Sequence, residues 1–316
     1  AVELDPLSVI IQYEHAKALW ATGRIDLAMS TLLDNVKRNP DFPYNYKLMT
    51  RWKLQTGNVG DAMRWIMALR KLEPDSPSHW AEFGGECHLY SVLDQPDAAT
   101  QCLSDFAAVY PDSVIAKPWL AEKAAYEAGE IDEPPNFFGY RSKRAIDFFR
   151  ARVAEEPGNG YRANQLAFYL EQHQQHEELV EVMERAYPEL FEQPPLVNGA
   201  TTWPAMMSAL ALQKLGETEQ ATLLLDAIEE VISGMRLITG PGFTNGIEDV
   251  EVAALRGDTE EALAALRRAI DQNWRFTWDY KPYSRALDSI RFDPRFEAMI
   301  EEIRADIARQ RAWYER

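Results

Sequence analysis

The sequence predicts an all-helical solenoid built from about seven helix–turn–helix repeats. In each of the first two repeats, an apolar-periodic run ends at a glycine, and a second run carries an alanine before a proline closes it. The equivalent residues are 34 positions apart, pairing Gly23 with Gly57, Ala28 with Ala62, and Pro40 with Pro74. A period of this length indicates paired helices that stack on their neighbours.

These two units resemble the tetratricopeptide repeat (TPR). The resemblance implies a superhelix in which the first helix of each pair lines a concave groove. The first repeat is predicted from about Val9 to Pro40 and the second from about Pro43 to Pro74. Gly23 suits the left-handed backbone that ends a first helix, because a Cβ atom is unfavourable there. In the third repeat, we place Trp80, Phe83 and Gly84 on the first helix.

The later repeats depart from the pattern at identifiable places. In the fourth, a loop inserted at Ile131–Arg144 displaces the alanine to Ala145, and we interpret this loop as either a packed surface loop or a lip over the groove. The fifth repeat lacks the glycine, and Pro194-Pro195 then breaks the chain. Another loop is predicted at Ser233–Gly246, before the seventh repeat.

We expect residues 1–316 to form a single array. A division into sub-arrays 1–195 and 196–316 is also open, with repeats over 196–272 and a C-terminal cap over 273–316. Because residues 1–6 read like the end of a second helix, we expect this chain to be cut from a longer protein. A terminal repeat needs a cap with a polar outer side. The last predicted helix has such a side, formed by Glu301, Glu302, Arg304, Asp306, Arg309 and Arg311.

Three segments of the tail resemble a recurrent C-terminal TPR region: Leu255-Arg256-Gly257-Asp258, the aromatic stretch Trp274–Tyr283, and Asp293-Pro294-Arg295-Phe296. This region is similar to the C-terminal part of bacterial winged-helix transcriptional regulators and class III adenylate cyclases. The resemblance implies a regulatory region whose effector domain lies elsewhere. Neither effector domain is present in this sequence, so no catalytic residue is carried over.

The composition argues against several classes of partner. The formal charge is −17, from 50 acidic and 33 basic residues, which disfavours general binding of nucleic acid. No apolar run approaches the ~18–20 residues that span a bilayer, so we expect no membrane insertion by this segment. We expect a soluble domain that is the cytoplasmic or periplasmic part of its parent protein, and a membrane anchor elsewhere in the parent stays open. We expect Cys87 and Cys102 to be two buried thiols, with a bridge between paired helices as the alternative.

We find no catalytic, metal-binding or cofactor-binding motif, and we expect no enzymatic activity. His173 and His176 could present two imidazoles, but a zinc ion would need further ligands. We interpret these histidines as part of a solvated turn between two helices.

The first helices of repeats one to four carry a stripe without Asp or Glu at the positions expected to face the groove. An aromatic and basic groove in an acidic protein suits a protein segment or peptide that is acidic or ends in a carboxylate. In the alternative interpretation, the rings fill the inner curve of the superhelix and the basic side chains are simply solvated. The predicted binding residues are Tyr13, Lys17, Trp20, Tyr44, Lys47, Arg51, Trp119, Lys123 and Tyr126.

Overall fold

The computed structural model describes residues 8–77, 80, 84–132, 143–239 and 246–316, and these contain helices and no strand. The predicted all-helical solenoid is confirmed, with seven helix pairs and a final helix in this described part. The α-helices are α1 (Val9–Ala21), α2 (Ile25–Arg38), α3 (Pro43–Gln55), α4 (Val59–Leu72), α5 (Glu86–Val92), α6 (Pro96–Val109), α7 (Ala116–Glu127), α8 (Lys143–Glu155), α9 (Gly160–Gln172), α10 (His176–Ala186), α11 (Thr202–Leu215), α12 (Thr218–Thr239), α13 (Ile247–Leu255), α14 (Thr259–Asp271) and α15 (Pro294–Tyr314). Three short 3-10 helices are η2 (Pro188–Phe191), η3 (Lys281–Tyr283) and η4 (Arg285–Leu287).

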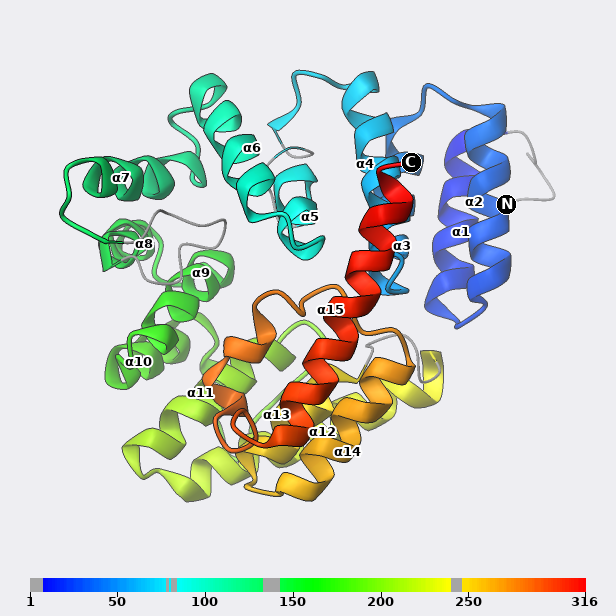
Figure 1. Cartoon of the computed structure of the whole chain (residues 1–316). Coiled ribbons are helices and arrows are strands. Elements are labelled where there is room, and N and C mark those ends of the chain that lie inside the picture. Colours follow the sequence, from blue (N-terminus) through cyan, green and yellow to red (C-terminus); the bar gives the residue numbers. More distant parts are fainter. Residues whose placement is uncertain (1–7, 78–79, 81–83, 133–142, 240–245) are drawn as a thin grey trace.

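Consecutive helices form pairs, from α1 with α2 to α13 with α14, and the pairs follow a curve (Figure 1). The alanines of the repeat pattern lie where the two helices of a pair approach. Ala28, Ala62, Ala99 and Ala145 are all buried, so the small side chain permits close packing there. One hydrophobic cluster extends from Ala145 to Val252 across residue 195, and the division into sub-arrays stays a prediction.

Two element boundaries differ from the prediction. Helix α5 begins at Glu86, so Trp80 lies in the turn before it rather than on it, and Phe83 is outside the described residues. The left-handed φ of +83° at Gly84 stops the helix from extending further back. Helix α12 continues to Thr239, past the predicted loop start at Ser233, because the apolar residues Met235, Leu237 and Ile238 extend the run and no proline occurs before Pro241. Residues 240–245, and 133–142 of the inserted loop, lie outside the described part.

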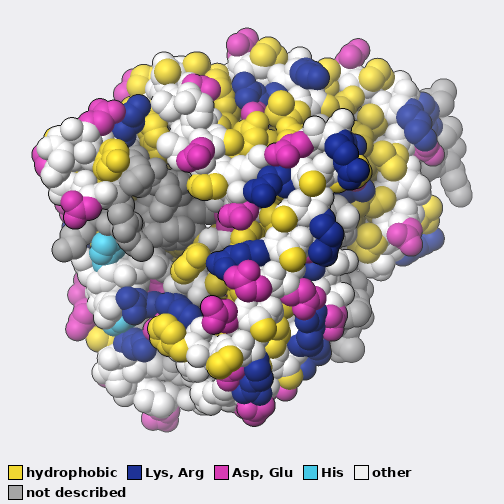
Figure 2. All heavy atoms as spheres, in the orientation of Figure 1, with side chains coloured by type: hydrophobic (Ala, Val, Ile, Leu, Met, Phe, Trp, Pro, Cys, Tyr) yellow, Lys and Arg dark blue, Asp and Glu magenta, His cyan; other side chains and the backbone are white. Residues whose placement is uncertain are grey.

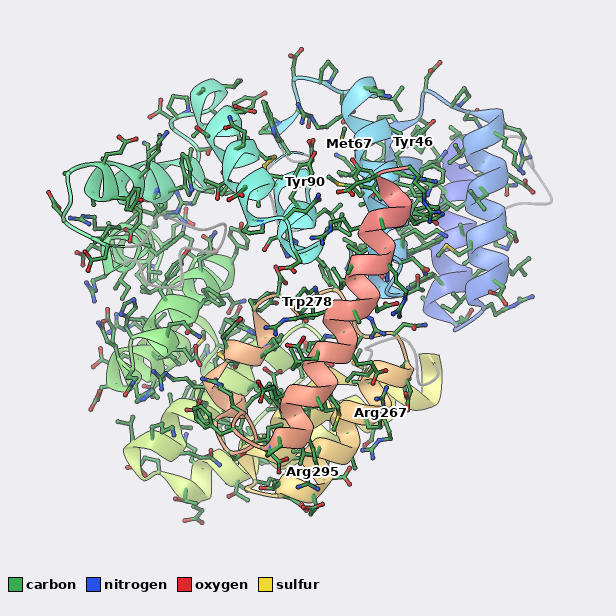
Figure 3. The ribbon with its side chains drawn as sticks, in the orientation of Figure 1. Tyr46, Met67, Tyr90, Arg267, Trp278 and Arg295 are labelled. Atoms are coloured by element: carbon green, nitrogen blue, oxygen red, sulfur yellow. A yellow bond between two sulfur atoms is a disulfide. The ribbon has the colours of Figure 1, made fainter. Side chains whose placement is uncertain are left out.

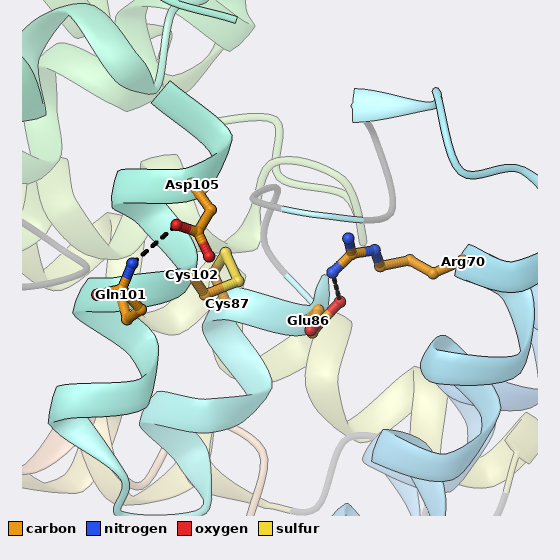
Figure 4. The surroundings of a disulfide bond; sticks show 6 residues. All are labelled: Arg70, Glu86, Cys87, Gln101, Cys102 and Asp105. Atoms are coloured by element: carbon orange, nitrogen blue, oxygen red, sulfur yellow. Dashed lines mark hydrogen bonds and ion pairs between the residues drawn. A yellow bond between two sulfur atoms is a disulfide. The ribbon is translucent and has the colours of Figure 1, made fainter. Parts of the chain in front are cut away.

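The two cysteines are bonded to each other, so the expectation of two thiols is wrong and the alternative holds (Figure 4). Cys87 on α5 and Cys102 on α6 are both buried, as expected. Their Cα atoms are 5.3 Å apart because the two helices form one hairpin, which places these side chains opposite each other. An ion pair between Arg70 and Glu86 joins the preceding repeat to α5 beside this bond (Figure 4).

The last helix packs on the second repeat as well as on the seventh. We call this contact between the two ends of the array the closure. Helix α15 packs on both α14 and α4, and its residues Ile303 and Ile307 are fully buried. Near its end, the Gln310 side chain donates to the carbonyl oxygen of Gly57 at 2.8 Å and accepts from the Gly60 N–H at 3.1 Å. Figure 1 shows α15 crossing from α14 toward α4.

The polar side of α15 is largely as predicted. Glu301, Glu302, Arg304 and Arg309 are exposed, and Figure 2 shows acidic and basic side chains interspersed over this face. Two other predicted members are half-buried because they take part in the closure. Asp306 pairs with Arg275 at 2.9 Å, and Arg311 donates to the carbonyl oxygen of Asp94 at 2.8 Å.

Substituting Gly57 by alanine should destabilise the protein more than the same change at Gly257. Both glycines are left-handed, with φ of +75° and +76°, so both variants share the backbone strain of about 1 kcal/mol. Only at Gly57 would the added Cβ meet another segment, 2.3 Å from the carbonyl oxygen of Asn273, whereas nothing lies within 4 Å at Gly257. This overlap should add about 1–3 kcal/mol. Urea unfolding of the two variants measures the difference, and equal losses would contradict the closure onto repeat two.

Candidate functional site

The first helices of repeats one and two present an aromatic surface. Helix α1 begins after its cap Ser8, and Pro43 starts α3 at a position where a missing N–H costs nothing. Their spacing brings Tyr13 against two rings, with centroids 6.0 Å from Phe42 and 6.3 Å from Tyr44. Tyr44 is 54% exposed. The aromatic cluster is therefore half-buried at its base and open to solvent at Tyr44.

Three basic residues border this cluster. The Lys17 Nζ atom lies 5.3 Å from the centroid of Tyr13, the Lys47 Nζ atom lies 5.6 Å from that of Tyr44, and Arg51 is exposed. Lys17 also pairs with Glu14 at 2.9 Å, and this hydrogen bond raises the pKa of the Lys17 ammonium group. Lys47 and Arg51 form no ion pair among the described residues. The positive charge beside the aromatic cluster that is not paired with an acidic side chain thus comes mainly from Lys47 and Arg51 of α3.

The two predicted tryptophans lie in the core. Trp20 is 6% exposed, and its ring stacks in parallel on Trp52 with centroids 4.4 Å apart. Trp119 is 7% exposed and packs with Phe106 and Cys102. Both indole rings are buried between helices, so neither is available as an exposed anchor for a ligand. For these two residues, the burial agrees with the alternative interpretation, in which the aromatic rings pack inside the array.

The nine predicted residues fall into two separate groups. Lys123 and Tyr126 accompany Trp119 on α7, where the Lys123 Nζ atom lies 5.4 Å from the Trp119 centroid and 3.9 Å from Glu127. Figure 1 shows α7 on the opposite side of the molecule from α1 and α3. The first group lies on α1 and α3. Trp20 is its buried member, and we call the other five residues, Tyr13, Lys17, Tyr44, Lys47 and Arg51, the α1–α3 face. It is a local surface because the curve of the array carries α7 away from it.

The inner side of repeats five to seven is occupied by the chain itself. The segment between α14 and α15 places Tyr280 against Phe168, with centroids 6.3 Å apart, and the N–H of Arg285 donates to Glu171 at 2.8 Å. Lys281 reaches the buried Glu251 at 2.6 and 2.7 Å. This arrangement was not predicted from the sequence. The signal was the aromatic stretch Trp274–Tyr283, whose apolar rings need a buried surface.

Glu171 makes this internal contact sensitive to pH. Burial raises the pKa of its carboxyl to about 7, from 4.5, despite hydrogen bonds from Arg285 and Gln172 that favour the charged form. The folded state therefore holds this proton more tightly than the unfolded state does. The resulting stabilisation is complete below pH 4.5 and is lost as the pH rises through about 7.

We expect Glu171→Gln, which keeps this side chain neutral, to remove that part of the pH dependence. From about pH 5 to about pH 7.5, the wild type should lose about 2–3 kcal/mol more stability than the variant. Urea unfolding at the two pH values measures the difference, in which the contributions of all other groups cancel. Identical pH profiles would show that Glu171 ionises in the folded state as readily as in the unfolded chain.

The described residues contain no group of three or more His, Cys, Asp or Glu side chains placed to hold a metal ion. His173 and His176 are both half-buried at the turn between α9 and α10, and burial lowers the pKa of His176. Across the described part of the chain, no helix combines the length and apolar character that a bilayer span requires.

Nineteen chains of solved structures are similar to this chain. The chain is similar to a chain in the crystal structure of the APC/C hetero-tetramer Cut9-Hcn1, with a TM-score of 0.45 and 13% identity. The match covers 96% of this chain and 50% of that chain, so this chain spans half the length of the protein that it matches. No protein-family model matches the sequence, and no curated protein matches it either.

Proposed function

We propose that this chain is a non-catalytic interaction module that binds an acidic, extended protein segment on the α1–α3 face. The supporting observation is that Lys47 and Arg51 present unpaired positive charge beside the exposed ring of Tyr44 in a protein of net charge −17. Ligand carboxylates would pair with these two residues, and an apolar side chain would contact the tyrosines. The partner is a protein, a peptide or a neighbouring domain of the parent protein.

The occupied inner side of repeats five to seven also favours this location. There, Lys281 and Arg285 of the chain itself contact the array, so a partner would have to displace a packed segment. No segment of the described chain covers Tyr44, which is 54% exposed. The α1–α3 face therefore offers an aromatic and basic surface that needs no rearrangement before binding.

Charge reversal on α3 tests the proposal. Lys47→Glu/Arg51→Glu should abolish capture of an acidic partner segment in pull-downs from the native host, because like charges would then face each other. Lys37→Glu/Arg38→Glu on α2 is the matched control. It changes the net charge equally at two exposed residues outside the face, and it should leave capture unchanged. Both variants must first show wild-type unfolding curves. Capture of the same partners by all three proteins would refute the proposal.

A second candidate is the regulatory region of a bacterial signalling protein. The specific observation is that the tail resembling such proteins forms the closure, since residues 273–314 contact repeats two, three, five and seven. A signal that opens or tightens this contact would move repeats that are distant along the chain. The coding sequence that flanks this chain in its gene tests this candidate, because it should encode a winged-helix or cyclase domain.

A further inference from the structure

A cavity of 150 Å³ lies where three parts of the chain meet at the closure. Ser91 comes from α5, Trp278 and Asp279 come from the segment before η3, and Ile300 and Arg304 come from α15. Figure 3 shows Trp278 beside α15, and its indole N–H donates to the carbonyl oxygen of Val92 at 2.8 Å. The wall thus combines the side chain of Trp278 with the apolar side chains of Pro282 and Ile300.

Asp279 is a buried carboxyl group with incomplete hydrogen bonding. Its side chain is 6% exposed, and its Oδ2 atom accepts from the Ser91 hydroxyl group at 2.8 Å. Within the described part of the chain, the Oδ1 atom has no hydrogen-bond partner. A buried carboxyl oxygen that lacks a donor is unfavourable by about 1–3 kcal/mol or more.

The surrounding basic groups do not neutralise Asp279. The Nε2 atom of His88 is 3.9 Å from Oδ2, but burial lowers the pKa of His88 to about 3, so this imidazole is neutral. Arg304 pairs with Glu301, and Lys281 pairs with Glu251. Without a cation, burial raises the pKa of the Asp279 carboxyl to about 7.

We propose that this cavity binds a small primary alkylammonium ion through Asp279. The ammonium group supplies the missing donor and positive charge, while the short alkyl chain contacts Pro282, Ile300 and the Trp278 ring. The volume equals about five water molecules, which suits an amine of about five heavy atoms. An anion is disfavoured because a second carboxylate, Asp94, also lines the cavity. This site is separate from the α1–α3 face and does not depend on the function proposed for it.

Titration calorimetry with n-butylammonium and with its neutral isostere n-butanol tests the site in the full chain. We expect butylammonium to bind at least about tenfold more tightly, because only the cation can pair with the carboxylate. Its affinity should rise from about pH 6 to about pH 8, since the amine requires Asp279 to be ionised. Butanol binding should show no such rise. Nα-acetyl-lysine amide, titrated in parallel, distinguishes a free amine from the lysine side chain of a protein as the source of the ammonium group. It binds as tightly as butylammonium only if the cavity accepts a lysine side chain.

Two variants with the same change in charge separate the roles of the cavity carboxyls. Asp279→Asn should lower butylammonium affinity at least about tenfold and remove its dependence on pH, whereas Asp94→Asn should change it by less than about threefold. Equal affinity for butanol and butylammonium would overturn the proposal, as would the absence of saturable binding by wild type. The comparison of the two ligands needs only the wild-type protein, so it decides the question even if Asp279→Asn does not fold.

Discussion

Lys281→Met is expected to lower the free energy of unfolding by about 3–5 kcal/mol. The substitution leaves the Glu251 carboxylate, which is 1% exposed, without the ammonium group that binds both of its oxygens. A buried charge that loses its partner keeps its full desolvation cost, and this cost explains the size of the effect. Urea unfolding at neutral pH measures it.

The double variant Lys281→Met/Glu251→Leu is the matched control. Because it removes both charges, it should recover most of the lost stability. Arg185→Met, which breaks the exposed pair with Glu181, should cost less than about 1 kcal/mol. If Lys281→Met and the double variant were equally unstable, packing of the methylene chain rather than charge would hold the segment against α13.

Trp20→Ala is expected to cost about 3–5 kcal/mol of stability. The substitution removes a ring that is 6% exposed and stacked on Trp52, and leaves a cavity between the first two repeats. Thermal or urea unfolding measures the loss. Partner binding by the folded fraction should remain, because the indole lies beneath the α1–α3 face rather than on it.

Tyr44→Ala should behave in the opposite way. Its ring is 54% exposed, so its removal should change stability by about 0.5 kcal/mol or less. Partner affinity should fall, since this ring is the exposed aromatic contact of the proposed face.

If Trp20→Ala kept full stability while partner capture was lost, the buried stacking of Trp20 on Trp52 would be the wrong arrangement in solution.

The repeat register could be read from the sequence because it depends on short-range chemistry. Gly23, Gly57 and Gly257 adopt the left-handed φ that only glycine reaches without strain, and each ends the first helix of a pair. The buried alanines follow from the same period. The role of the candidate face in binding stays a prediction. The aromatic and basic residues of α1 and α3 lie together because adjacent repeats place equivalent positions side by side.

The repeat pattern could not show that α7 lies away from this face. It also could not show that both tryptophans are buried. A helical period identifies which residues share a side of one helix, but it does not report how far the array has turned after four repeats. It also does not separate a ring that faces solvent from one that stacks on the next helix. Trp20 and Tyr44 occupy the same stripe, and only the neighbouring helix decides their burial.

The sequence by itself determined the helix pairs, their turns and the buried small residues, because these follow from backbone conformation and helical periodicity. The bond between Cys87 and Cys102, which the sequence left open as an alternative, lies within one helix hairpin. The tertiary structure alone decided that the aromatic stretch before α15 fills the inner side and that α15 packs on α4. These contacts join residues up to 253 positions apart, such as Gln310 and Gly57. Their partners are selected by the shape of the whole array, which no local pattern encodes.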